Sequence, residues 1–255
     1  MPDTAIPPDA IAAYKATDFC VDGDMPFILH IGEPCAALAA LFAKENYASC
    51  AFISPCNPFG ETADSNQNDA RQAAFGRMLE ARGWRGHFFV TTGRVGAPTF
   101  LSPEQVRELN ERGHVVGSHS ETHPPRMSHC SPEELLGEWR RSVAFLSEPL
   151  GEEVVTASVP GGFYSRAVAE AAARAGVRRL FTSEPTERVE EVEGCLVFGR
   201  YGVQRWTTPE AVAGIVKGDF LPRRRQQLAW SAKKLTKRVG GEYYLRARRA
   251  LIGRG

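Results

Sequence analysis

The residues best suited to chemistry are His119 and His123, in the segment GSHSETHP (117–124). Two neutral imidazoles four residues apart can bind one divalent metal ion and leave positions for a carboxylate and for water. Such an ion polarises an acyl oxygen and lowers the pKa of its bound water to about 7. The Gly-Ser before the pair and the Pro-Pro after it favour a loop over a helix. Histidines that merely pack in a surface loop are the alternative interpretation of this spacing.

A second candidate segment is VPGGFYSR (159–166). Glycines after a strand let the backbone approach a ligand closely, and backbone N–H groups there can stabilise an oxyanion. The alternative is a tight turn in which Ser165 caps the next helix. The candidate residues of this loop are Pro160, Gly161, Gly162 and Tyr164.

The elements that must position these loops alternate between strand and helix. Short apolar runs predict strands at 27–31, 50–54, 87–91, 114–117, 154–158, 177–183 and 195–201. Helices are expected at 34–44, 69–82 and 166–175, after capping boxes at Ser102 and Ser131, and from Thr208. This alternation predicts a parallel α/β sheet or barrel, whose right-handed crossovers bring the loops after the strands to one face. Both candidate segments are therefore expected at the same end of the fold.

From about residue 82 to about 250 the sequence resembles the polysaccharide deacetylases of the NodB-like carbohydrate esterase family. The segments that carry the resemblance are GWRGHFFVTTGRVG (83–96), RGHVVGSHSETHP (112–124), ASVPGGFYSR (157–166) and VRRLFTSEP (177–185). The resemblance implies a distorted (β/α) barrel and a divalent metal ion, with zinc expected, held by two histidines and an aspartate. It also implies a second aspartate as general base and removal of N- or O-acetyl groups from a carbohydrate. By this resemblance His119 and His123 are metal ligands, and the Pro160–Tyr164 loop lines the substrate groove.

Three motifs of that family are altered in this chain. The strand that should end in Asp-Asp has no counterpart, because the sequence contains no Asp-Asp pair. The Leu-x-His motif is missing and CLVFGRY (195–201) offers Arg200 instead, while the usual Arg-x-Pro-Tyr becomes Ser158-Val-Pro-Gly. Glu61 and Asp64 in loop 55–68 are weak candidates for the missing carboxylate, with solvated loop acids as the alternative. Glu184 and Arg200 are candidates to line the site.

The N-terminal third has a different resemblance. Residues 27–84 are similar to a small bacterial domain family of unknown function, through FISPCNP (52–58) and the segment NQNDARQ (66–72). We therefore expect three parts: an apparently truncated N-terminal segment (1–84), a deacetylase-like domain (85–221) and a basic helical tail (222–255). The junction would make the chain chimeric, with the strand at 50–54 in place of the first barrel strand. A function dominated by the N-terminal family is a further hypothesis.

The basic tail carries much of the positive charge of the chain. Residues 222–255 hold eleven Lys or Arg and one acid, whereas the other 221 residues hold 20 basic and 29 acidic residues. Interleaved apolar residues predict a basic amphipathic helix, which suits an anionic membrane surface or a lipid-linked glycan. A helical face packed on the barrel by its apolar stripe is the alternative. Nucleic acid is not expected as a partner, because no reader motif accompanies the charge.

Composition and the N-terminus set the expected compartment. The 255 residues are 43% apolar and 24% charged, which is ordinary for a globular protein and excludes disorder. No run of 18 apolar residues and no signal peptide are present, and the six cysteines form no CxxC pair. We expect a cytoplasmic protein, with a peripheral position at the inner face of the membrane as an option. The leading hypothesis is a metal-dependent deacetylase of reduced activity; the alternative is an inactive protein that binds a glycan or a membrane surface.

Overall fold

The computed structural model describes residues 27–31, 50–55, 80, 86–97, 100–203, 208–232, 234 and 235. The expected helices at 34–44 and 69–82, apart from Glu80, lie outside these residues, as does most of loop 55–68. None of the helices within the described ranges is long and apolar enough to cross a lipid bilayer.

A nine-stranded sheet forms the centre of the molecule, in the order β7-β8-β6-β5-β4-β3-β2-β1-β9. Neighbouring strands are parallel except for the antiparallel pair β7 and β8. The strand predicted at 50–54 is observed as β2, and it lies between β1 and β3. The strands are β1 (Phe27–Ile31), β2 (Cys50–Pro55), β3 (Gly86–Val90), β4 (Val115–Ser118), β5 (Thr156–Ser158), β6 (Arg179–Phe181), β7 (Glu190–Val192), β8 (Cys195–Phe198) and β9 (Tyr201–Val203).

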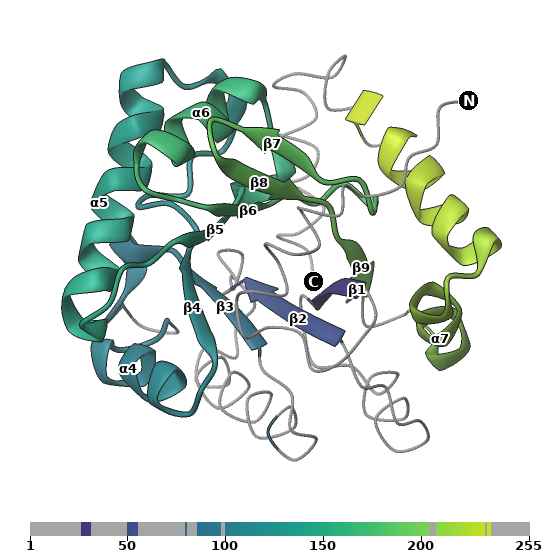
Figure 1. The fold of residues 1–255 in the computed structure, drawn as a ribbon, viewed down its shortest axis with the longest axis horizontal. Coiled ribbons are helices and arrows are strands. Elements are labelled where there is room, and N and C mark those ends of the chain that lie inside the picture. Colours follow the sequence, from purple (N-terminus) through teal and green to yellow (C-terminus); the bar gives the residue numbers. More distant parts are fainter. Residues whose placement is uncertain are drawn as a thin grey trace.

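The sheet curves into a distorted barrel. Only Gly199 and Arg200 connect β8 to β9, although these strands lie near opposite ends of the sheet order. Such a link spans at most about 11 Å, so the two ends of the sheet must approach each other. Figure 1 shows the strands arranged in an arc with the helices outside it. The predicted α/β fold with a mostly parallel sheet is confirmed.

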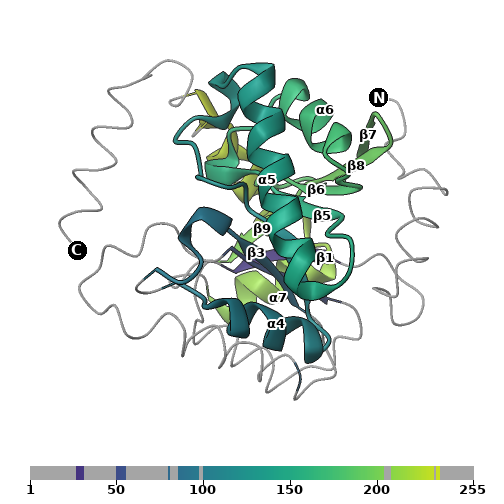
Figure 2. The ribbon, with the colours of Figure 1, turned by 90° about the vertical axis from the view of Figure 1, so that its left-hand side faces the viewer.

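Among the described residues, strands are followed by the helices α4 (Pro103–Glu111), α5 (Pro132–Leu150), α6 (Arg166–Arg174) and α7 (Pro209–Lys217). Ser102 and Ser131 form the predicted capping boxes, and Ser165 caps α6. The longest helix, α5, continues past its expected end near residue 147 until Gly151 adopts a left-handed conformation. In Figure 2, α5 and α6 lie on the outer side of the sheet.

Side chains alternate between the two faces of the curved sheet. Ala157, Leu180 and Val197 belong to the core cluster that also contains Trp139 of α5 and Val168 of α6. Trp139 Nε1 donates to the Val168 carbonyl at 3.2 Å and ties the two helices together. On the inner face Phe181 contacts Phe89 and Phe198, with ring centroids 5.5 and 5.3 Å apart. The inward-facing residues that follow these phenylalanines along the chain lie at the carboxyl end of the barrel.

The structure corrects the strand predicted at 195–201. It is two strands, β8 and β9, with a bend at Gly199. A Cβ atom on Gly199 would lie 2.4 Å from the Thr186 carbonyl oxygen and 2.5 Å from that of Glu184, so only glycine permits this bend. The loop predicted at 183–194 also contains the short strand β7, which the sequence did not indicate.

The C-terminal helix covers residues 220–232, with 234 and 235 also helical, and it contacts the barrel through Trp230 and through polar side chains. Gln226 exchanges two hydrogen bonds with the backbone of Gly202, at 2.9 and 2.7 Å, and Arg223 pairs with Glu187. The large leucines face solvent instead. Their exposed fractions are 71% for Leu221, 59% for Leu228 and 62% for Leu235.

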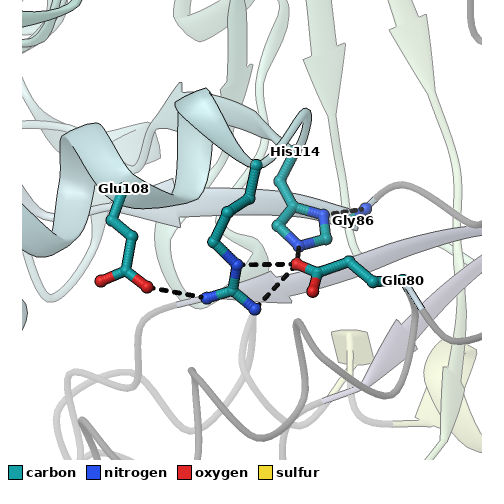
Figure 3. Close-up of polar contacts among 5 residues, drawn as sticks. Glu80, Gly86, Glu108 and His114 are labelled. Carbon is teal, nitrogen blue, oxygen red and sulfur yellow. Dashed lines mark hydrogen bonds and ion pairs between the residues drawn. The ribbon is translucent and has the colours of Figure 1, made fainter.

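At the amino ends of β3 and β4 a polar network closes the barrel (Figure 3). Glu80 Oε1 accepts from Arg112 Nε at 2.8 Å and lies 2.8 Å from Nε2 of the buried His114. Gly86 N donates to His114 Nδ1 at 3.1 Å, so the imidazole presents Nε2–H to the carboxylate. Arg112 also contacts Glu108 at 3.2 Å.

Candidate metal and ligand site

His119 and His123 lie together at the carboxyl end of β4, where the sequence placed them. Their ring centroids are 5.1 Å apart and their planes are inclined by 57°. His119 is buried, with 2% of its surface exposed. Its Nδ1 lies 2.6 Å from Ser158 Oγ and 3.0 Å from the Ser158 carbonyl oxygen, at the end of β5. The carbonyl can only accept, so this contact favours the tautomer in which Nδ1 carries the proton and Nε2 is the ligand nitrogen.

The loop between the histidines is held in an unusual backbone conformation. Ser120 and His123 have positive φ angles of 64° and 58°, which non-glycine residues seldom adopt. His123 N donates to Ser120 Oγ at 3.0 Å. Thr122 donates through its backbone N–H and its hydroxyl to the carboxylate of Glu138 on α5, at 2.8 and 2.6 Å. These bonds fold the chain back, so that the imidazole of His123 lies beside that of His119.

The histidine pair fits two ligands of a divalent metal ion. Two imidazoles that bind one tetrahedral ion have ring centroids about 5 Å apart, given metal–nitrogen distances of about 2.0–2.1 Å. The observed 5.1 Å matches this requirement. Within the described residues no group of three or more His, Cys, Asp or Glu side chains forms a complete metal site. A third protein ligand is therefore not among the described carboxylates; Glu61 and Asp64 lie outside the described residues.

The glycine loop forms a short 3₁₀ helix, η4 (Pro160–Gly162), directly after β5. Gly161 and Gly162 have φ angles of 58° and 66°, which only glycine adopts freely. A Cβ atom on Gly162 would lie 2.7 Å from Trp230 Cη2 and 2.9 Å from Ser183 Oγ, so this loop, β6 and the C-terminal helix meet here. Tyr164 is half-buried beyond the loop, and burial raises the pKa of its phenol to about 12. The predicted tight turn with Ser165 as the cap of α6 is confirmed, and the approach of its backbone to a ligand stays a prediction.

Arg200 and Glu184 lie beside the same loop. Arg200 is 3% exposed, and its Nη2 donates to Ser183 Oγ at 3.3 Å. Burial lowers the pKa of its guanidinium to about 9. The Glu184 carboxylate accepts from Lys234 of the C-terminal helix at 3.3 Å, and its backbone carbonyl accepts from Arg200 N at 2.8 Å. Both residues therefore lie at the carboxyl ends of β6 and β8.

Residues 61–180 match the family model described as polysaccharide deacetylase. The predicted resemblance to the polysaccharide deacetylases is confirmed. The match begins at residue 61, inside the segment that was predicted to resemble a family of unknown function. The boundary at residue 84, and the chimeric origin that it implies, stay predictions.

Solved structures of similar fold include deacetylases. The Streptococcus pyogenes deacetylase PplD in complex with acetate has 16% identity and a TM-score of 0.59, over 77% of this chain and 99% of that one. The putative polysaccharide deacetylase BA0330 from Bacillus anthracis has 15% identity and a TM-score of 0.58, over 75% of this chain and 68% of that one. The BpsB deacetylase domain from Bordetella bronchiseptica has 13% identity and a TM-score of 0.55, over 72% and 98%. No curated protein sequence is significantly similar to the chain.

Sequence reasoning missed the residues that support the candidate site. Ser158 was noted only as a departure from the family motif, yet it holds His119. Ser183 and Trp230 come from segments far apart in the chain, and no local pattern connects them to Gly162. A small polar residue at the end of each predicted strand is the signal that would have pointed to Ser158 and Ser183.

Proposed function

We propose that the chain is a hydrolase that removes N- or O-acetyl groups from a carbohydrate, with a divalent metal ion held by His119 and His123. The observation that carries the proposal is the paired imidazoles, with centroids 5.1 Å apart, inside the region that matches the deacetylase family. When bound, the metal would polarise the acyl oxygen and acidify a water molecule. Zinc is the expected ion because imidazoles are among its preferred ligands.

The other residues of the site position and surround the reacting groups. Ser158 orients the His119 ring through Nδ1, and the backbone N–H of His119 donates to the Val90 carbonyl at 2.8 Å, which fixes the main chain at this residue. The Pro160–Gly162 loop would line the groove and offer a backbone N–H to the oxyanion. Tyr164 carries its proton at neutral pH, as any phenol does, and would serve as a hydrogen-bond donor; burial raises its pKa further.

We expect low activity because the chain has no Asp-Asp pair. A general base typically contributes 10²–10⁴-fold to the rate, and the side-chain amide of an Asn or Gln cannot act as one. Glu61 or Asp64 would restore part of this if either reached the site. The alternative within this proposal is a catalytically inactive protein that binds a glycan.

The test uses the full chain, zinc content and acetate release from a chitooligosaccharide. We expect about one zinc ion per chain and slow acetate release, with both lost in His119→Ala. His129→Ala is the matched control, since His129 is an exposed histidine at the end of η3 (Met127–His129). Zinc binding that depends on His119 without acetate release supports the inactive alternative. Wild-type protein that binds no zinc and releases no acetate contradicts the proposal.

A second proposal concerns the C-terminal helix, which we infer binds an anionic membrane surface at the cytoplasmic face, where a lipid-linked glycan would be presented. The supporting observation is that Leu221, Leu228 and Leu235 recur every seven residues and are 59–71% exposed. Arg224 and Arg225 are exposed on the same helix. Exposed leucines beside cations suit the boundary between lipid headgroups and acyl chains.

Sedimentation with vesicles tests this second proposal. We expect binding to vesicles that contain phosphatidylglycerol, weak binding to pure phosphatidylcholine, and a loss of several-fold in Leu228→Gln. Phe145→Gln on α5 is the control, because Phe145 is an exposed apolar side chain away from this helix. Equal binding of both variants, or no binding to anionic vesicles, contradicts the proposal.

A further inference from the structure

Arg200 is a buried cation whose charge no described carboxylate compensates. Its side chain donates to Ser183 Oγ through Nη2 at 3.3 Å, while Nε and Nη1 have no hydrogen-bond partner among the described residues. The residue is 3% exposed. A buried charge without a partner is costly, and burial alone lowers the pKa of this guanidinium to about 9. Such an arrangement persists where a ligand supplies the opposite charge.

The position of Arg200 identifies what such a ligand would meet. Phe198 faces the barrel interior, and Arg200 is two residues further along the same chain, at the carboxyl end of β8. Its partner Ser183 stands two residues beyond the inward-facing Phe181 and lies against Gly162 of η4. The guanidinium therefore belongs to the same end of the barrel as His119 and the glycine loop.

The charges nearby favour an anion with a single negative charge. Lys234 is paired with Glu184 at 3.3 Å, and Arg223 is paired with Glu187. Arg200 is thus the uncompensated cation among the described residues of this rim. A guanidinium with N–H groups in one plane matches the planar oxygen pair of a carboxylate, whereas a phosphate dianion would call for further positive charge. Trp230, against Gly162, adds an aromatic surface that suits a sugar ring.

We propose that Arg200 and Ser183 bind the carboxylate of an acidic sugar, so that the substrate is an acetylated glycan containing carboxylated residues. The substrate class rests on the proposed deacetylase function, but carboxylate binding at Arg200 does not. Acetate, the other product of deacetylation, carries the same charged group and is the second source that the experiment must separate.

The experiment titrates the full-length protein with sodium glucuronate, sodium acetate, sodium phosphate and glucose, and follows heat of binding and the thermal unfolding midpoint. We expect glucuronate to bind and to raise the midpoint, acetate and phosphate to bind at least several-fold more weakly, and glucose not to bind. In Arg200→Met the glucuronate dissociation constant rises at least tenfold. Arg200→Lys retains the charge and shows an intermediate loss.

The matched control is Arg188→Met, because Arg188 is an exposed arginine in the connection between β6 and β7. Its glucuronate affinity stays at the wild-type value. The proposal is overturned by an affinity that is unchanged in Arg200→Met, by phosphate or acetate binding as tightly as glucuronate, or by no binding at all. The wild-type comparison of the four probes decides the question even where a variant does not fold.

Failure of the proposed function gives a different result. If glucuronate binds through Arg200 but no acetylated glycan releases acetate, the deacetylase proposal fails and the carboxylate site stands. If acetate is released equally from neutral and acidic glycans and glucuronate does not bind, the deacetylase proposal stands and the carboxylate site fails.

Discussion

Each end of the barrel holds a histidine and an arginine, but the hydrogen-bond partners of these side chains differ between the two ends. At the amino ends of β3 and β4, His114 and Arg112 share the carboxylate of Glu80. At the carboxyl ends, His119 and Arg200 hydrogen-bond to the hydroxyls of serines. The Glu80 carboxylate pairs with Arg112 and accepts from His114, which completes a structural contact, whereas a serine hydroxyl orients its partner and leaves that group able to bind a ligand. The amino end therefore stabilises the fold, and the carboxyl end is prepared for a ligand.

The largest expected effect is on stability at the amino end. Replacing Glu80 with alanine leaves the partly buried Arg112 and the buried His114 without their shared acceptor. We expect a loss of about 3 kcal/mol in the free energy of unfolding, because the buried Nε2–H of His114 and the partly buried guanidinium of Arg112 both lose their acceptor. Urea unfolding measures it. The control Glu108→Ala, whose pair with Arg112 is more exposed, should cost below about 1 kcal/mol. Equal losses in both variants would show that Glu80 contributes no more to stability than the exposed pair of Glu108 and Arg112.

The next effect is a pH dependence from His87, which lies between the two ends. His87 is buried against Phe181, with ring centroids 5.3 Å apart, and burial lowers its pKa to about 3, with a smaller contribution from Arg179. The unfolded chain binds a proton near pH 6.5 and the folded chain does not, so stability is complete above about pH 6.5 and falls as the pH drops toward 3. We expect a loss of about 2 kcal/mol between pH 7 and pH 5, from denaturant unfolding at each pH. A His87→Phe variant with the same slope would contradict this origin.

A smaller effect is expected on metal affinity at the carboxyl end. Ser158→Ala removes the hydroxyl 2.6 Å from His119 Nδ1 but keeps the backbone carbonyl at 3.0 Å. Groups that orient a metal-bound histidine contribute 10–100-fold to affinity, so we expect a loss of about tenfold, measured by zinc competition with a chromophoric chelator. Ser165→Ala, which removes the cap of α6, should instead cost about 1 kcal/mol of stability and leave zinc affinity unchanged. The reverse result would make Ser158 a purely structural residue.

The elements of the barrel that were predictable from the sequence are those set by local chemistry. The capping boxes at Ser102 and Ser131 predict the starts of α4 and α5, and short apolar runs predict β3, β4 and β6. The bend at Gly199 was not predictable, because it depends on the carbonyls of Thr186 and Glu184 on another connection. The outward-facing leucines of the C-terminal helix follow from contacts with Gly202 and Glu187, which a helical pattern cannot reveal.

The candidate site divides in the same way. His119 and His123 carry a spacing and a setting that the sequence displays, and the structure brings them together. Arg200 was expected to line the site as a substitute in an altered motif, but its burial and its contact with Ser183 arise from the way β6 and β8 pair. Contacts between neighbouring strands depend on register, which the sequence of one strand does not contain.

The central claim is that His119 and His123 bind a metal ion at the carboxyl end of the barrel. At the amino end the carboxylate of Glu80 already occupies the corresponding histidine, His114. Crystals soaked with zinc and measured at the zinc absorption edge test it most directly. We predict an anomalous peak about 2.1 Å from a nitrogen of each of these two histidines, and none near His114. A peak at His114 and Glu80, or well-ordered His119 and His123 without a peak between them, would contradict the account.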